Sequence, residues 1–302
     1  MLHIPLSRSE RETVEAFEEQ RRLQLRRSRL SGLVLLLGVS ALLGISFHVS
    51  DFFSGSHGDD PWQRIASLLD RMAPDLRAEV LLESRETPGS FASWFYEFPR
   101  WLALLWETVQ IAIVATVLGT IGGGLASLLA SKNLAPAPWL HWGTRRTLEI
   151  IRTLPDLIVA LILVAAFGIG PLAGVIAIAL GTTASLGKLF SEANENVDPG
   201  PMEAIRAAGG SWWAQMRFGM LPQVIPTHAS YALMRLEMNV GAAAALGVVG
   251  AGGIGIELSR AITWMQFDTY LAILLLIIGL IFVIDMVSEA VRHRLMGLGA
   301  AA

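Results

Sequence analysis

The stretch EAIRAAG at residues 203–209, with LP at residues 221–222, decides the fold of this chain. Both stretches lie in a polar island between long apolar runs. Asp198 supplies an N-cap acceptor, and Pro199 fits the first turn of a helix, where backbone N–H groups lack intrahelical partners. Gly209 admits a positive φ angle and so ends such a helix. The island therefore predicts a short helix that begins after Asp198 and ends at Gly209.

A second short helix is expected in the same island. Ser211 can cap it, and Trp212, Met216 and Met220 recur at four-residue spacing, which predicts an apolar ridge. The Leu-Pro pair at 221–222 closes the unit, because proline disrupts a helix interior. The spacing predicts a compact helix-turn-helix knob that is fixed to the membrane at both ends. An ordinary amphipathic loop lying on the bilayer would show the same spacing.

The composition is that of an all-α membrane protein. Of the 302 residues, 53% are hydrophobic and 16% are charged, which is too apolar for a soluble domain. The chain has no cysteine, so it has neither a disulfide nor a thiolate metal site. The net charge of −3 and the placement of arginines at the ends of the apolar runs give no indication of a nucleic-acid partner. We predict transmembrane helices at residues 30–49, 101–131, 148–169, 172–190, 224–249 and 270–291.

Positive charge orients these helices. Arginine and lysine residues gather before the first predicted helix, between the second and the third, and after the last. With six spans these groups fall on one side, which is the cytoplasmic side. Residues 1–29 and 292–302 are therefore expected in the cytoplasm, together with the knob at 192–222. About thirty residues precede the first apolar run, more than a signal peptide places there, so residues 30–49 are interpreted as a retained signal anchor.

The knob resembles the cytoplasmic coupling loop of ABC-importer permeases. Its pattern is E-A-x-x-x-x-G, nine residues, then x-x-L-P, and in that family the loop docks into a cleft on the ATPase subunit. Ile205 stands where the family usually has alanine, and Gly219 where it usually has isoleucine, which is expected to loosen the second helix by about 1 kcal/mol relative to alanine. The resemblance assigns ATPase coupling to Glu203, Ala204, Arg206, Gly209, Leu221 and Pro222.

Further stretches are similar to the phosphonate branch of these permeases. They are RTLPD (152–156), SEANENVDPG (191–200), YALMRLEMNV (231–240) and LGVVGAGGIG (246–255), and the resemblance covers most of the chain from Glu107 onward. It implies the type I ABC importer permease fold, with a permease core at 101–291. Gly241 departs from the pattern, since arginine is usual there. The implied cargo is therefore a phosphorus oxyanion, with phosphite and hypophosphite beside organic phosphonates.

Several ionisable residues fall inside predicted spans, where each costs about 2.5 to 3.5 kcal/mol at the bilayer centre unless it has a partner or a water-filled path. They are Glu107, Arg152, Asp156, His228, Arg235, Glu237 and Asp285. Arg152 can pair with Glu149 or Asp156 at helical spacing, in a structural or gating role. Glu237 lies roughly 20 Å along its helix, near the middle of the bilayer. We assign Arg152, Arg235, Glu237 and Asn239 to the translocation path or its gate, with Glu237 bracing and Asn239 a possible contact, and expect His228 to pack with a hydrogen bond.

The glycine-rich stretches are interpreted as packing devices. Residues 250–255 spell G-x-G-x-x-G, but no βαβ unit surrounds them, so a close helix approach or a broken helix at the external mouth is expected. Gly119 and Gly123 form a small-xxx-small pair that predicts helix packing. Residues 181–188 do not form a Walker A loop, because one residue too many separates the glycines and Leu189 replaces Ser or Thr. ATP and Mg²⁺ are therefore expected on a separate subunit.

The resemblance implies a multi-pass protein of the bacterial cytoplasmic membrane that works by alternating access. Its expected partners are a second copy of the chain, two ATP-binding subunits, an extracytoplasmic binding protein and membrane lipid. Residues 50–100 form an external segment with an amphipathic helix beginning near Pro61, which is expected in the outer membrane interface. The alternative is that this segment helps to receive the binding protein.

Three other functions remain open. A permease for amino acids or another organic solute would share the fold. In a membrane-embedded enzyme, His228 and Ser230 would have to act together, but they lie on different helix faces, and H-E-x-x-H is absent, so we assign no catalytic residue and no metal ligand. A self-powered secondary transporter would leave the knob unexplained.

Overall fold

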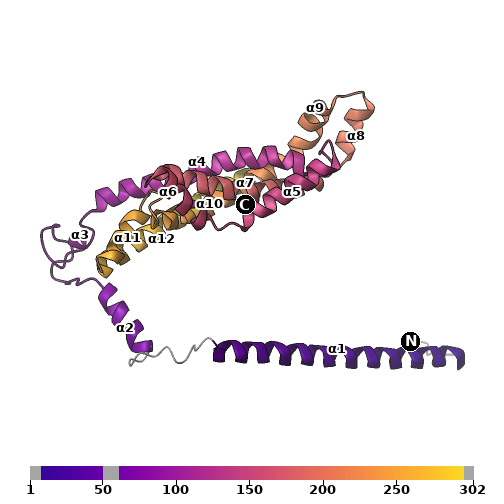
Figure 1. Cartoon of the computed structure of the whole chain (residues 1–302), viewed down its shortest axis with the longest axis horizontal. Helices are drawn as coiled ribbons and strands as arrows, with labels where there is room; N and C mark the ends of the chain where they lie inside the picture. The colour runs from indigo at the N-terminus through magenta and orange to yellow at the C-terminus, as the bar shows by residue number, and fades with distance from the viewer. Residues whose placement is uncertain (1–7, 50–60, 296–302) are drawn as a thin grey trace, which may run out of the picture. The chain divides into compact units, whose positions relative to one another are not determined.

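The computed structural model describes residues 8–49 and 61–295, and every regular element in these ranges is helical (Figure 1). The chain divides into two compact units, residues 1–68 and 69–302. Parts of the expected cytoplasmic ends and of the external segment, at 1–7, 50–60 and 296–302, lie outside the described residues.

The first unit consists mainly of α1 (Arg8–Val49), with the greater part of α2 (Pro61–Met72). The predicted signal anchor at 30–49 is the C-terminal half of α1, which is continuous with the predicted cytoplasmic segment. Residues 20–49 are long and apolar enough to cross a membrane, and their large hydrophobic side chains are exposed. This length and composition are typical of a membrane-spanning helix. The helix expected near Pro61 is confirmed as α2.

The second unit is a bundle of long helices. In chain order its elements are α3 (Phe91–Trp94), α4 (Phe98–Ala130), α5 (Pro138–Thr153), α6 (Asp156–Phe167), α7 (Pro171–Glu195), α8 (Gly200–Ala207), α9 (Trp212–Ala214), the π-helix η1 (Gln215–Met220), α10 (Leu221–Gly247), α11 (Gly255–Thr263) and α12 (Phe267–Leu295). In Figure 1, α8 and α9 project at one end of this unit, and α3 and α11 lie at the other.

The pair α4 and α7 makes the most extensive contact in the bundle, and small residues allow it. A Cβ atom on Gly123 would lie 2.9 Å from the backbone nitrogen of Gly187, and one on Gly119 would collide with Thr182. The predicted packing role of Gly119 and Gly123 is therefore confirmed. Around this pair, α6, α10 and α12 contribute to one apolar core that includes Ile178.

Four described helices pass a length and hydropathy test for a membrane span: residues 20–49, α4, α7 and α12. The helix expected at 148–169 is interrupted, because α5 and α6 are bent by 82°, and only together are they long and apolar enough for one broken span. Leu154 lies between them in an extended conformation, as expected for a residue that precedes proline. The expected span at 224–249 corresponds to α10, which has 27 residues and is less apolar than α4, α7 and α12, because it contains Arg235, Glu237 and Asn239.

The glycine-rich stretch at 250–255 interrupts the helical structure between α10 and α11, as predicted. Gly250, Gly252 and Gly253 all have positive φ angles, which side chains other than glycine rarely adopt. A Cβ atom on Gly252 would lie 2.9 Å from the Cα of Pro171. The loop therefore packs against the beginning of α7, and it is held to α4 where Glu107 Oε1 accepts a hydrogen bond from the Gly253 N–H (3.2 Å).

Residues before the predicted core at 101–291 also belong to the second compact unit, which begins at residue 69. Trp101 is fully buried, and Trp94, Phe95 and Tyr96 pack against the same cluster as α11 and α12. Trp94 Nε1 also donates a hydrogen bond to the carbonyl of Asp268 (2.9 Å). The last part of the external segment is thus attached to the bundle.

We expect Gly123→Ala to lower the melting temperature of the detergent-solubilised protein. The added methyl group must displace the backbone at Gly187, and such overpacking typically costs about 1–3 kcal/mol. Gly124→Ala is the matched control, since a Cβ atom there meets nothing within 4 Å and alanine favours the helix. Equal melting temperatures for the two variants would contradict the packing role of Gly123.

Candidate functional site

The first helix of the knob is built as the sequence predicts. Asp198 Oδ1 accepts a hydrogen bond from the Gly200 N–H (3.0 Å), and α8 follows directly. Gly209 has a φ angle of 79°, and the Gly210 N–H reaches back to the carbonyl of Ile205 (2.8 Å). This positive-φ turn ends α8 and reverses the chain.

The second half of the knob differs from the prediction. Ser211 caps α9 through the Ala214 N–H (3.4 Å), as expected, but α9 ends at once and η1 continues as a π-helix. Met216 and Met220 are buried as expected, whereas Trp212 is 43% exposed and lies outside their ridge. The prediction of a regular second helix with a continuous apolar ridge is therefore wrong.

Gly219 lies in this π-helix and is in close contact with α8. A Cβ atom there would lie 2.9 Å from Cγ and 3.1 Å from Cα of Met202 in α8. Glycine at this position therefore permits α8 to pack closely on η1, a contact that an isoleucine would block.

The Leu-Pro pair at 221–222 does not close the unit, which corrects the sequence prediction. The helix runs on from η1 into α10, and Pro222 lies in the first turn of α10, where its missing N–H costs little. The knob is closed by Gln223 instead. Its Nε2 donates to the carbonyls of Asp198 (3.2 Å) and Gly219 (2.7 Å), and its Oε1 accepts from the Asp198 N–H (3.1 Å).

The residues assigned to ATPase coupling are accessible. Glu203, Ala204, Arg206, Gly209, Leu221 and Pro222 are all exposed. The aromatic side chains of Trp213 and Phe218 are also exposed, at 75% and 66%. The knob therefore presents a surface of mixed charge and apolar character that a partner can contact.

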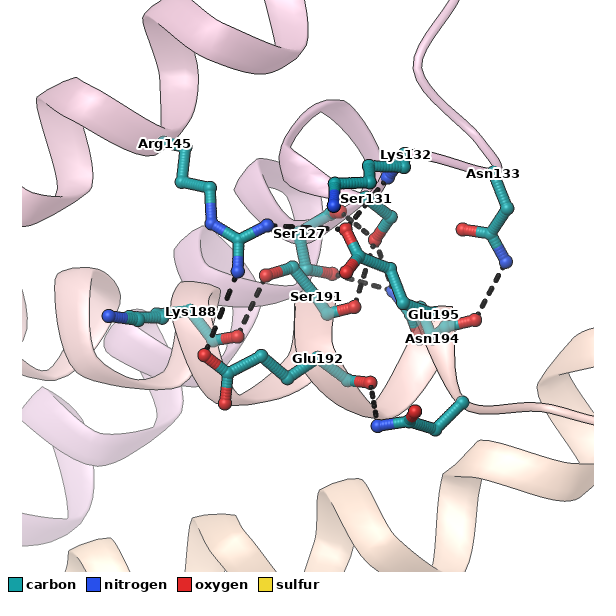
Figure 2. Close-up of polar contacts among 11 residues, drawn as sticks. Ser127, Ser131, Lys132, Asn133, Arg145, Lys188, Ser191, Glu192, Asn194 and Glu195 are labelled. Atoms are coloured by element: carbon teal, nitrogen blue, oxygen red, sulfur yellow. Dashed lines mark hydrogen bonds and ion pairs between the residues drawn. The ribbon is translucent and has the colours of Figure 1, made fainter.

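A buried polar cluster lies at the base of the knob and joins α4 to α7 (Figure 2). Asn194 is fully buried, and its Nδ2 donates to the hydroxyl oxygens of Ser127 and Ser131, both at 3.3 Å. Asn133 donates to the carbonyl of Asn194 (2.7 Å). Because buried polar groups are costly without partners, these bonds fix the end of α7 against the end of α4.

Ion pairs extend the same cluster to α5. Arg145 lies 3.3 Å from Glu195 and 3.7 Å from Glu192, and Glu195 also accepts a hydrogen bond from the Lys132 N–H (2.9 Å; Figure 2). The ends of α4, α5 and α7 are thus fastened together where the chain enters the knob. Sequence reasoning missed this cluster, although Glu192, Asn194 and Glu195 lie in the resembling stretch at 191–200.

Asn239 occupies the centre of the bundle and is 1% exposed. Its Nδ2 donates to Thr116 Oγ1 in α4 (2.8 Å) and to Thr182 Oγ1 in α7 (3.0 Å). In this conformation the amide braces α4, α7 and α10. Arg235, one turn away, donates from Nε to the same Thr182 hydroxyl (3.4 Å).

Arg152 and Arg235 are brought together at the break between α5 and α6. Both line a cavity of about 290 Å³, together with Asp156 and Ser185. The expected pairing of Arg152 with Glu149 or Asp156 is not formed among the described residues, because Glu149 pairs with Arg146 and the break at Leu154 takes Asp156 out of the helical register. The cavity is therefore lined by charged side chains that ion pairs leave free.

Glu237 faces away from this cavity, towards α12. Its Oε1 lies 3.4 Å from Nη2 of Arg292, and both side chains are largely buried. His228 stacks on Phe190 with ring centroids 4.1 Å apart, but its Nε2 makes no hydrogen bond within the described part of the chain. The four residues assigned to the path or gate thus divide between the cavity, the central amide and an ion pair with α12.

A bundle with several apolar helices long enough to span a membrane, and with an exposed helical knob at one end, defines the class of multi-pass membrane proteins. The sequence profile of the family described as "Binding-protein-dependent transport system inner membrane component" matches residues 122–297, more than half of the chain. The chain belongs to this family of multi-pass inner-membrane transport components.

Three relatives have informative names. The chain is 40% identical to a phosphate-import permease protein of Mycolicibacterium smegmatis over 190 residues, which cover 63% of this chain and 36% of that protein. It is 37% identical to a phosphite transport system permease protein of Stutzerimonas stutzeri over 200 residues, 66% of this chain and 73% of the relative. It is 44% identical over 119 residues to a putative cryptic phosphonate transport system permease protein of Escherichia coli, 39% of this chain and 98% of the relative.

Solved structures confirm the predicted type I importer permease fold. A chain of an amino acid ABC transporter superposes with a TM-score of 0.57 at 21% identity, over 68% of this chain and 98% of that one. A chain of the inward-facing MetNI methionine ABC transporter superposes with a TM-score of 0.57 at 22% identity, over 65% and 95%. At such identities the likeness concerns the fold alone.

We expect Asn239→Ala to destabilise the bundle. The change leaves the hydroxyl groups of Thr116 and Thr182 without their amide partner, at a cost of about 1–3 kcal/mol. Thermal unfolding in detergent measures the loss. Met238→Ala is the matched control, because its side chain is 57% exposed on the same helix. Equal losses for both variants would contradict the bracing role of Asn239.

Glu237→Gln is expected to lower substrate uptake while the protein still inserts and assembles, because it removes the ion pair that joins α10 to α12. Arg292→Gln should have the same effect. The exchange of the two charges, Glu237→Arg with Arg292→Glu, should restore part of the uptake. Proteoliposome uptake measures all four proteins, and normal uptake in both single variants would remove this pair from the transport cycle.

Proposed function

We propose that this chain is the permease subunit of an ATP-driven importer that carries a phosphorus oxyanion across the cytoplasmic membrane. The cargo class includes phosphite, phosphonates and hypophosphite. It is supported by the names of relatives that import phosphate or transport phosphite or phosphonate. The observation that carries the proposal is the exposed knob, which is fastened at its base to α4, α5 and α7 and is continuous with α10.

The proposed partners follow from this role. Two copies of the chain form the path, two ATP-binding subunits that hold ATP and Mg²⁺ receive the knobs, and an extracytoplasmic binding protein delivers the anion. The knob and both ends of the chain face the cytoplasm in this arrangement. The arginine and lysine residues on that side support the orientation.

The chain's own residues suggest how docking could move the helices. When the ATP-binding subunits close, each knob is displaced through Glu203, Arg206 and the turn at Gly209. The bonds of Asn194 and Arg145 deliver that displacement to α4, α5 and α7, and α10 carries it to Arg235 and Asn239. Alternating access then results from reorientation of the bundle around the central path.

Uptake by the reconstituted complex tests the cargo. The permease, its ATPase and its binding protein are placed in proteoliposomes, and ATP-dependent uptake of phosphite, methylphosphonate and hypophosphite is compared with uptake of methionine. ATP-dependent accumulation of a phosphorus oxyanion is expected. Accumulation of methionine instead would favour the amino-acid permease, and uptake without the ATPase would favour a secondary transporter.

We expect Gly209→Val to abolish uptake and substrate-stimulated ATPase activity while membrane insertion is retained. The φ angle of 79° is strongly unfavourable for a β-branched residue, although a Cβ atom there meets nothing within 4 Å. Gly209→Asn is the matched control, since asparagine tolerates this conformation and should keep most of the activity. Normal import by the valine variant would show that the turn does not couple the subunits.

A further inference from the structure

The cavity at the break between α5 and α6 combines donors and an acceptor. Arg152 comes from the last turn of α5, Asp156 begins α6, Ser185 lies in α7 and Arg235 in α10. Four helices thus contribute polar side chains to a space of about 290 Å³, enough for a small tetrahedral anion with some water.

The charged side chains that line the cavity are not neutralised by ion pairs with other described residues. None of Arg152, Arg235 and Asp156 forms an ion pair with another described side chain. Arg235 lies within electrostatic range of both Asp156 and Arg152. Two guanidinium groups and one carboxylate line the cavity, so positively charged groups outnumber negatively charged ones. A net positive cavity among apolar helices is costly unless an anion or water enters it.

A glycine in α7 provides the space in which the carboxylate of Asp156 lies. Gly181 faces Asp156 so closely that a Cβ atom on residue 181 would collide with Oδ1 of Asp156. A glycine in this part of the helix therefore leaves the room that the carboxylate occupies. The same glycine sits beside Thr182, which receives the hydrogen bond of Arg235 and so helps to orient that guanidinium.

We infer that this cavity binds a tetrahedral phosphorus oxyanion that retains one proton, with Arg152 and Arg235 holding its charged oxygens and Asp156 accepting a hydrogen bond from its P–OH group. The inference rests on the proposed function. Guanidinium groups only donate hydrogen bonds and an ionised carboxylate only accepts them, so the three groups together select a ligand with both kinds of oxygen. The Ser185 hydroxyl can serve either kind.

This arrangement distinguishes among small anions. Phosphite and phosphonates keep a P–OH group in part of their population, because the second ionisation of a phosphoryl group lies near neutral pH. Sulfate and the hypophosphite anion carry no such proton, and each would place an unprotonated oxygen against the carboxylate of Asp156. The cavity should therefore bind phosphite and phosphonates more tightly than sulfate or hypophosphite.

Saturation-transfer NMR on the detergent-solubilised permease–ATPase complex, without the binding protein, tests this. The P–H proton of phosphite reports its binding, and sulfate and hypophosphite are added as competitors. In the wild-type complex, each competitor is expected to displace phosphite about tenfold less well than methylphosphonate does, as one hydrogen bond to a charged group predicts. Asp156→Asn should remove this discrimination, because an amide can donate to an unprotonated oxygen.

Glu149→Gln is the control, since Glu149 pairs with Arg146 outside the cavity and its loss should leave the selectivity unchanged. If Asp156→Asn fails to assemble, Gly181→Ala displaces the same carboxylate and should also reduce the discrimination. Absence of phosphite binding, equal competition by hypophosphite in the wild-type complex, or wild-type selectivity in Asp156→Asn would each overturn the inference.

Uptake by wild-type proteoliposomes separates the two conclusions. If the complete transporter accumulates a phosphorus oxyanion while the cavity shows no selectivity, only the binding site is refuted. If it accumulates none, the proposed function itself is refuted.

Discussion

The side-chain amide of Asn239 is the contact on which the arrangement of the bundle depends. In apolar surroundings an unpaired amide is costly, so it fixes α10 at the one height where Thr116 and Thr182 can both receive its hydrogen atoms. With that height set, Arg235 is directed towards the cavity at the break between α5 and α6, and Glu237 towards α12. The polar residues that make α10 a poor membrane span by composition are therefore the ones that place it.

Sequence patterns predicted those features that depend on neighbouring residues. The turn at Gly209, the cap at Ser211 and the break between α10 and α11 follow from local backbone preferences, and they were found correctly. The bend at Pro155 follows from an equally local rule, but the long apolar run around it concealed the break. The close packing of α8 on η1 could not be predicted, because Gly219 and Met202 meet only when the chain has folded back at the turn between these helices.

The sequence predicted individual residues of the candidate site, but not the contacts that bring them together. Arg152 and Arg235 were selected because charges inside spans need partners, yet only the folded chain brings them to one cavity with Asp156. Asn194 and Gln223 were missed because a lone amide near a helix end has no periodic pattern. Both make contacts that close a structural unit, one at the base of the knob and one between its ends.

The helix that runs without a break from η1 through α10 connects the knob directly to the interior of the bundle. Arg235 lies fourteen positions after Leu221, so about 21 Å of helix joins the exposed knob to the charged centre. Along it, Pro226 removes one backbone hydrogen bond and forms the most compliant point. A displacement of the knob would therefore bend α10 most readily in the turn that contains Pro226.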